Sequence, residues 1–300
     1  MNLLDINGYL WHIYNMKLSK EILPESVKRY LHSENYDSGS IPTDISATRL
    51  KDSPRVNRLY KLHYKDIQPD YLKRGFAKLG EAWHGYMEQY APSDWICERR
   101  FYASAGDKLI SGAIDALEPC DGGFNIWDYK VMTAYKAQTE LKEFEAQLNI
   151  YAYILRQNDM QPKRLFISGL IRDWSDRRVT GEYPDTMFPV FELPLWCEEQ
   201  TEKYINERIQ AHFTEDIPLC TDEERWMSSP KFAVVSKKTG KALRVFDTEE
   251  QALSFQTKAP VVIEKREAEP IRCQRFCEVS EFCEQYQSEL FTKEVIGHDK

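Results

Sequence analysis

The sequence predicts a mixed α/β (α+β) fold, in which helices flank a central mixed sheet and a small cysteine-containing segment follows. Three observations predict it. Three strand-like segments, rich in Ile, Phe, Trp and Tyr and joined by short turns, occupy residues 95–132. Apolar residues at helical spacing lie on either side of them, over residues 70–92 and 136–157. Three cysteines crowd together between residues 273 and 283.

The length and composition are those of a globular chain. Of its 300 residues, 42% are hydrophobic and 13% aromatic, which suffices for a sizeable core. Asp5, Asn7 and His12 interrupt the first apolar residues, so we expect a cytoplasmic protein with no secretory segment and no membrane helix. A net charge of -8 argues against a protein that coats nucleic acid. It suits an enzyme whose carboxylates gather divalent cations beside a phosphate.

The N-terminal part is predicted to be an arm followed by a helix. Residues 1–31 contain short helical patterns, and residues 32–44 have the Ser, Gly, Pro and Asp content of a linker. We therefore expect an N-terminal arm over residues 1–44. Apolar spacing then predicts a helix that ends at Pro92 and carries His84.

Three strands follow this helix. Segments 95–104, 108–119 and 123–132 are separated by AGD and DGG turns, which predicts an antiparallel meander. A long helix over about 136–157 comes next, followed by a strand over 163–171. With a later strand and helix, these elements predict one core domain over residues 45–215.

A small insertion is predicted within the last segment, residues 216–300. Residues 232–246 have the pattern of a β-hairpin with a Lys-Lys-Thr-Gly turn, and a short helix and a strand follow. The insertion separates Cys220 from the three-cysteine cluster.

The second and third strands carry charges where a core is expected. Asp115 lies near the end of one strand and Asp128 on the next, so that their carboxylates can face each other across the ladder. Their repulsion is explained if Mg²⁺ or Mn²⁺ sits between them. Lys130, on the same face as Asp128, can hold a water and stabilise charge on a phosphate. A salt-bridge ladder on the surface is the alternative for such a pattern taken alone.

Four short motifs in order resemble the RecB-like branch of the PD-(D/E)xK nuclease superfamily. They are GEAWH with His84, GAID with Gly112 and Asp115, DYK with Asp128 and Lys130, and QLNIY with Gln147 and Tyr151. The resemblance covers residues 80–151. It implies a restriction-endonuclease-like core and metal-dependent cleavage of DNA.

The resemblance also implies a metal site. His84, Asp115 and Asp128 would bind Mg²⁺ or Mn²⁺ together with the backbone carbonyl of Tyr129. Lys130 would orient the attacking water.

Further roles follow from the remaining matches. The resemblance implies that Gln147 and Tyr151 contact the DNA backbone near the scissile phosphate. Glu81 and Glu88 lie near His84 on its helix and are candidates to assist through water. Without the other motifs, His84 and Tyr151 would be ordinary core residues and Gln147 a solvated one.

The cysteines suggest a second metal centre. Cys273, Cys277 and Cys283 follow a C-x3-C-x5-C spacing that is typical of metal ligands. RecB-like nucleases of the AddB and CRISPR-associated types carry a [4Fe-4S] cluster on three such cysteines and one upstream, often in a Cys-Pro-Arg stretch. Ser53 stands before Pro-Arg here, so Cys220 is the best replacement. Zn²⁺ is the rival ion, and buried thiols without a metal are the remaining alternative.

The expected function is therefore that of a metal-dependent DNA nuclease, an exonuclease of recombination, repair or phage replication. DNA is the expected partner, and a recombination or replication protein is a further candidate. The alternative is a non-catalytic nucleic-acid-binding or complex-assembly module with the same fold. Lys130 favours the enzyme, because binding alone does not require a lysine beside two carboxylates.

Overall fold

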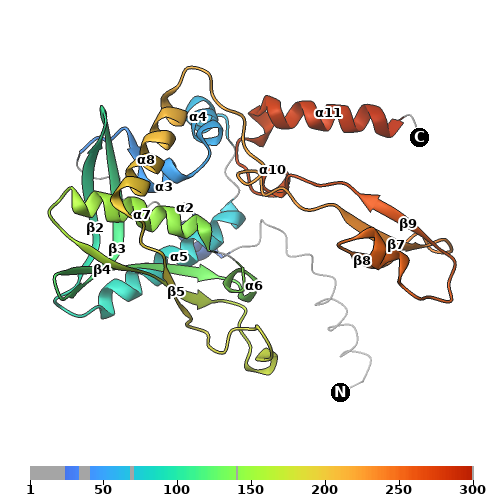
Figure 1. Ribbon diagram of the computed structural model, residues 1–300, viewed down its shortest axis with the longest axis horizontal. Coiled ribbons are helices and arrows are strands. Elements are labelled where there is room, and N and C mark those ends of the chain that lie inside the picture. Colours follow the sequence, from blue (N-terminus) through green and yellow to red (C-terminus); the bar gives the residue numbers. More distant parts are fainter. Residues whose placement is uncertain (1–23, 34–40, 68–70, 140, 299–300) are drawn as a thin grey trace.

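The structure is a computed structural model that describes residues 24–33, 41–67, 71–139 and 141–298 (Figure 1). The short helical patterns predicted within residues 1–23, and most of the predicted linker over 34–40, lie outside the described residues.

A mixed sheet flanked by helices forms the centre of the fold, as the sequence predicts. Its strands are β1 (Ile45–Ser46), β2 (Ile96–Ala105), β3 (Lys108–Cys120), β4 (Gly123–Met132), β5 (Pro162–Ile171) and β6 (Val190–Leu193). Strands β2, β3 and β4 form the predicted antiparallel meander. Strand β5 adds parallel to β4, and β6 adds antiparallel to β5.

The partners of β3 leave a gap at the level of Asp115. Strand β2 pairs along one edge of β3. On the other edge, β1 pairs with residues 110–111 and β4 pairs from Ala116 onward. Among the described strands, none pairs with residues 112–115 on that edge. Asp115 therefore lies where β4 diverges from β3. Its carboxylate can contact groups that do not take part in the β3–β4 pairing.

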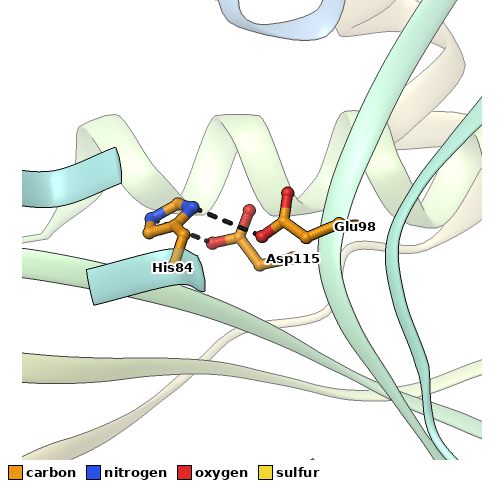
Figure 2. Close-up of side chains that lie close together, drawn as sticks. All are labelled: His84, Glu98 and Asp115. Carbon is orange, nitrogen blue, oxygen red and sulfur yellow. Dashed lines mark ion pairs between the residues drawn. The ribbon is translucent and has the colours of Figure 1, made fainter. Parts of the chain in front are cut away.

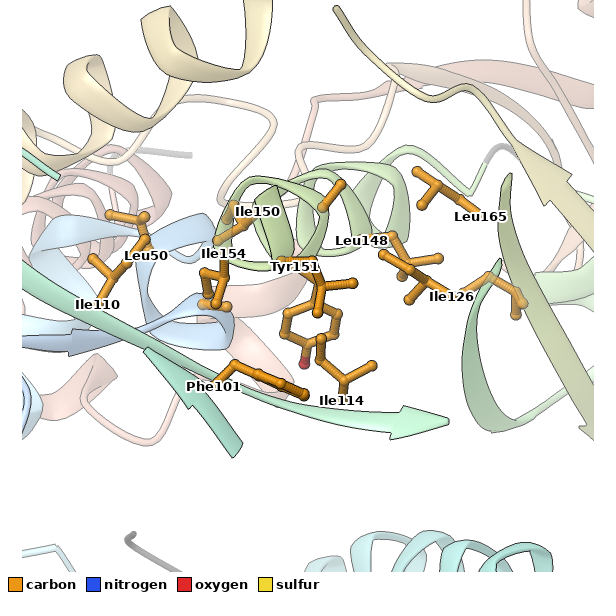
Figure 3. Packing of buried hydrophobic residues seen from close by; sticks show 14 of the residues in the cluster. Leu50, Phe101, Ile110, Ile114, Ile126, Leu148, Ile150, Tyr151, Ile154 and Leu165 are labelled. Atoms are coloured by element: carbon orange, nitrogen blue, oxygen red, sulfur yellow. The ribbon is translucent and has the colours of Figure 1, made fainter. Parts of the chain in front are cut away.

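Helices cover the sheet and complete the core. They are α2 (Glu25–His32), α3 (Ala47–Lys51), α4 (Pro54–His63), α5 (Tyr71–Tyr90), α6 (Ala134–Ala137), α7 (Lys142–Arg156) and α8 (Glu198–Phe213). Helix α7 contacts strands β2 to β5. Its Leu148, Ile150 and Ile154 are fully buried in the hydrophobic core that the sheet and the helices share (Figure 3). Each such side chain contributes roughly 1.5–3 kcal/mol.

The long helix predicted over 136–157 is in fact two helices. Thr133 caps the start of α6, where its hydroxyl accepts a bond from the backbone N–H of Lys136. The hydroxyl of Thr139 then donates to the carbonyl of Lys136 at 2.8 Å. This bond satisfies a carbonyl at the end of α6 without a further helical turn. Helix α7 starts anew at Lys142.

The residues before β1 are attached to the core. The Tyr30 hydroxyl of α2 donates to the carbonyl of Lys78 in α5 at 2.5 Å, and Leu31 is buried. The backbone N–H of Asp44 donates to the carbonyl of Leu109 at 2.9 Å. The hydrogen bonds of the sheet thus begin one residue before the predicted core.

A second, smaller sheet follows α8. It consists of β7 (Lys231–Ser236), β8 (Ala242–Phe246) and β9 (Val261–Arg266) in the antiparallel order β8-β7-β9, with α9 (Glu249–Leu253) between β8 and β9 in the sequence. The predicted hairpin is confirmed. This sheet and α11 (Glu284–His298) extend away from the main body (Figure 1). No helix in the described part of the chain is long and apolar enough to cross a membrane.

Candidate active site and cysteine cavity

His84 faces oxygen atoms of two strands from its place on α5. Its Nε2 lies 2.8 Å from the backbone oxygen of Tyr129 and 3.6 Å from Oδ2 of Asp115. The same Oδ2 accepts a 2.7 Å bond from the backbone N–H of Tyr129. One imidazole nitrogen and two oxygens therefore border the same small volume. This donor set suits a cation such as Mn²⁺ or Mg²⁺.

Glu98 of β2 joins this cluster on the other side of the imidazole ring. Its Oε1 lies 3.5 Å from Nδ1 of His84, and the ligand atoms of Glu98, His84 and Asp115 lie within 4.8 Å of one another (Figure 2). A carboxylate on Nδ1 fixes the ring and leaves Nε2 free to bind a metal. Glu98 has a φ of 46°, in the left-handed region, which costs a non-glycine residue about 1–2 kcal/mol.

Sequence reasoning missed Glu98 and considered Glu81 and Glu88 instead. Glu81 pairs with Lys78 at 2.6 Å, and Glu88 is exposed. The register of strands β2 and β3 is the feature that could have identified Glu98. Residues 97 and 99 of β2 pair with residues 116 and 114 of β3, which sets Glu98 opposite Asp115.

Burial and neighbouring charges shift the pKa values of this cluster in the absence of metal. Burial and the charge of Asp128 raise the pKa of Asp115 to about 7. Burial acts to lower the pKa of His84, but the bond to Glu98 and the charge of Asp115 raise it to about 9. The cluster therefore holds protons near neutral pH that a divalent cation has to displace.

Asp128 and Lys130 form an ion pair beside the cluster. Asp128 is fully buried, and its Oδ2 lies 2.5 Å from Nζ of Lys130. That ammonium also donates to the backbone oxygen of Tyr129 at 3.5 Å. Burial acts to lower the pKa of Lys130, but the charges of Asp128 and Asp115 raise it, so the side chain is a cation. Buried ion pairs add little net stability, so a function is the better reason for this one.

Gln147 and Tyr151 lie inside the protein, with only 6% and 3% of their surfaces exposed. The Gln147 amide lies 3.5 Å from Oδ1 of Asp128 and donates to the Tyr151 hydroxyl at 2.7 Å. The pair therefore supports Asp128, and its contact with DNA stays a prediction. The Tyr151 ring also explains Gly112, because a Cβ at that position would lie 2.7 Å from the ring.

The four predicted cysteine ligands line one cavity beside α4. They are Cys220, Cys273, Cys277 and Cys283. Sγ of Cys220 lies 3.1 Å from the hydroxyl of Ser53, the residue that stands before Pro-Arg. The Gln285 side chain bonds both the N–H and the carbonyl of Cys220, at 2.9 and 3.0 Å. A cysteine side chain at position 53 would therefore lie next to the side chain of Cys220.

The four cysteine sulfurs are not gathered as closely as the ligands of a single zinc ion. Four thiolates on one Zn²⁺ stand about 3.8 Å apart, given Zn–S bonds of about 2.3 Å in a tetrahedron. Among the described residues, no three cysteine sulfurs lie within 4.8 Å of one another. Burial raises the pKa of Cys220 to about 11, so a metal has to displace its proton. Arg225 and Arg272 line the same cavity and offer positive charge to thiolates.

Comparisons with known proteins include one family match. The family model described as "PD-(D/E)XK nuclease superfamily" matches residues 68–284, a range that includes the acidic cluster and all four cysteines. A solved structure named "Crystal structure of SSO0001" aligns at 18% identity over 61% of this chain and 83% of that chain, with a TM-score of 0.44. No curated protein matches the chain.

Proposed function

The chain belongs to the PD-(D/E)XK nuclease superfamily, and from this premise we propose that it is a metal-dependent deoxyribonuclease of the RecB-like branch. One observation carries the proposal. Nε2 of His84, Oδ2 of Asp115 and the backbone oxygen of Tyr129 converge beside the buried pair of Asp128 and Lys130.

Each residue has a task in this proposal. His84, Asp115 and the Tyr129 carbonyl would hold Mg²⁺ or Mn²⁺, and Asp128, whose carboxylate lies outside the 4.8 Å group of ligand atoms, would join them when the ion binds; the ion would activate water and stabilise charge on the phosphate. Lys130 already bonds the Tyr129 carbonyl, so its ammonium borders the volume in which the phosphate would lie. It donates to the attacking water or to a phosphate oxygen, where the developing charge strengthens the bond.

The finer proposal is exonucleolytic action in recombination, repair or phage replication, with a recombination or replication protein as partner. The ordered motifs and the cysteine cavity support it through their resemblance to AddB-type and CRISPR-associated nucleases. The non-catalytic binding module is the competing function. The Asp128–Lys130 pair favours the enzyme, because a buried charge pair beside a metal site has a use in hydrolysis.

A cleavage assay separates these functions. Linear and covalently closed circular DNA, each single- and double-stranded, are incubated with Mn²⁺, Mg²⁺ or EDTA. Metal-dependent loss of linear DNA alone supports an exonuclease, and loss of both forms supports an endonuclease. DNA binding without any cleavage supports the non-catalytic module and contradicts the proposal.

The cysteine cavity is proposed to hold a [4Fe-4S] cluster that attaches the C-terminal segment (216–300) to the nuclease core (45–215). The resemblance of the three downstream cysteines to the pattern of the iron–sulfur nucleases supports it over Zn²⁺. Anaerobic purification with iron, sulfide and zinc analysis tests the identity of the centre. Cys220→Ser should lose the cluster. Because the two side chains lie 3.1 Å apart, Ser53→Cys in the same chain should restore it. A metal-free protein whose Cys220→Ser variant has unchanged stability contradicts the site.

A further inference from the structure

Three lysines from separate elements surround the ring of Phe144, in the first turn of α7. The Nζ atoms of Lys51 (α3), Lys130 (β4) and Lys136 (α6) lie 5.6, 5.8 and 5.6 Å from the ring centroid. A cation over an aromatic face gains only about 0.5–1 kcal/mol at exposed sites. Like charges brought this close repel one another. The ring alone does not explain why three ammonium groups gather there.

The carboxylates nearby compensate the lysines only in part. Lys130 pairs with Asp128 at 2.5 Å, and Lys136 pairs with Glu143 at 2.9 Å. Lys51 donates instead to the backbone carbonyl of Glu143 at 3.2 Å, which is a neutral acceptor. Burial lowers the pKa of Lys51, and the charge of Lys130 acts in the same direction. Among the described residues, Lys51 is thus the member of the trio without a direct ion pair, although the charges of Glu143, Asp128 and Asp52 act on it.

The balance becomes more positive when Asp128 serves as a metal ligand. Its charge is then shared with the cation, so Lys130 and Lys51 lose part of their compensation. Helix α7 also begins here, at Lys142, and the positive end of its dipole adds to the local potential. A bound anion from outside the protein would compensate the remaining positive charge of these lysines.

We infer that Lys51 and Lys136 form a subsite for a second phosphate of the nucleic acid, next to the phosphate that is cleaved. The inference rests on the proposed function, because Lys130 connects the two places. Its Nζ lies 3.5 Å from the Tyr129 carbonyl at the metal site and 5.8 Å from the Phe144 ring at the subsite. Lysine ammonium groups bind phosphate as point charges and read no base. The subsite therefore fixes the position of the nucleic-acid strand along the site and has no preference for its base sequence.

Binding without metal tests the subsite. Fluorescence anisotropy measures the affinity for a labelled single-stranded oligonucleotide in EDTA at several salt concentrations. Lys51→Ala and Lys136→Ala should each bind about tenfold more weakly, as expected for a lost hydrogen bond to a charged group. The slope of log affinity against log salt should fall by about 0.7 for each phosphate that the variant no longer neutralises. Thermal unfolding of each variant verifies that it is folded.

Lys203→Ala is the matched control. Lys203 lies on α8 with 78% of its side chain exposed, and its nearest carboxylate oxygen, on Glu207, is 3.9 Å away. Its removal takes away one positive charge that is not among the three lysines around the Phe144 ring. Affinity and salt slope should therefore stay at the wild-type values.

Modified oligonucleotides locate the phosphate. A methylphosphonate removes the charge of one backbone position. At one such position the wild type should lose about tenfold in affinity, whereas Lys51→Ala should lose nothing further, because the charge pair is already broken. Oligonucleotides with a 5′-phosphate or a 5′-hydroxyl show whether the subsite holds an internal phosphate or the end of a strand.

Lysine variants that bind with wild-type affinity and slope overturn the inference. So does a wild type that binds no oligonucleotide. Because no metal is present, these results are independent of cleavage. A protein that shows the lysine dependence but never cuts DNA contradicts the nuclease proposal alone. A protein that cuts DNA while its lysine variants bind normally contradicts the subsite alone.

Discussion

Replacement of Asp115 by asparagine should stabilise the metal-free protein at alkaline pH, although it removes a proposed metal ligand. Burial and the charge of Asp128 raise the pKa of Asp115 from 3.8 to about 7. At about 1.4 kcal/mol for each pH unit, this difference corresponds to at most about 4 kcal/mol of lost stability at pH 8. The asparagine oxygen can still accept the bond from the Tyr129 N–H.

The pH dependence follows from the direction of the shift. Between about pH 4 and pH 7 the native carboxyl of Asp115 keeps a proton that the unfolded chain has lost. The free energy of unfolding of the wild type therefore falls as pH rises through this window. The free energy of unfolding of Asp115→Asn does not contain this decrease. The free energies of unfolding of the two proteins should therefore differ little near pH 4 and most at pH 8. In the wild type, His84, with its pKa raised to about 9, stabilises the protein most below about pH 6.5, and this stabilisation is lost as pH rises through 9; Asp115→Asn keeps only the part that does not come from the charge of Asp115.

Urea unfolding in EDTA at pH 5 and pH 8 measures the effect. Asp107→Asn is the control, because this carboxylate is exposed at the turn between β2 and β3 and forms only a surface ion pair with Lys108, so little change is expected. Mn²⁺ should then raise the melting temperature of the wild type by mass action but leave Asp115→Asn nearly unchanged. If Asp115→Asn is less stable than the wild type at pH 8 in EDTA, the reasoning is refuted.

Three further substitutions test the contacts around the site. Glu98→Gln should weaken Mn²⁺ binding about 10- to 100-fold in calorimetric titration, because the imidazole loses the carboxylate that orients it; an unchanged affinity would exclude that role. Gly112→Ala should lower the free energy of unfolding by roughly 1–3 kcal/mol, because the new Cβ meets the Tyr151 ring; urea unfolding checks this, and wild-type stability would contradict it. Lys130→Ala should destabilise the metal-free protein by about 3 kcal/mol, since Asp128 stays buried without its partner; urea unfolding in EDTA measures the loss, and its absence would show that Asp128 is not held as a charge.

The strands were predictable because period-two patterns and short turns are local signals. The meander of β2, β3 and β4 followed from them, and the turn placed Asp115 and Asp128 on adjoining strands. Their geometry differs from a simple ladder, because pairing stops at Ala116 and Trp127. The Asp115 carboxylate bonds the Tyr129 backbone instead.

Residues that meet only in the tertiary structure were beyond sequence reasoning. The register of β2 and β3 sets Glu98 opposite Asp115, but no local pattern signals its left-handed backbone or its contact with His84. Lys51 approaches Phe144 because α3 packs against α7, which is distant from it in the sequence. Cys220 was predicted because it follows the core and the insertion after it can fold back to the cluster, and its contact with Ser53 gives that prediction a geometric basis.

The rate of DNA cleavage by Asp128→Asn, relative to the wild type in saturating Mn²⁺ under single-turnover conditions, tests the central claim most directly. The asparagine keeps the size of the side chain and its bond to Gln147 but removes the charge that pairs with Lys130 and that the proposal assigns to the metal. The proposed site predicts a cleavage rate at least about a hundredfold lower, because charge stabilisation at the phosphate is lost. A folded variant that cleaves as fast as the wild type would contradict the account.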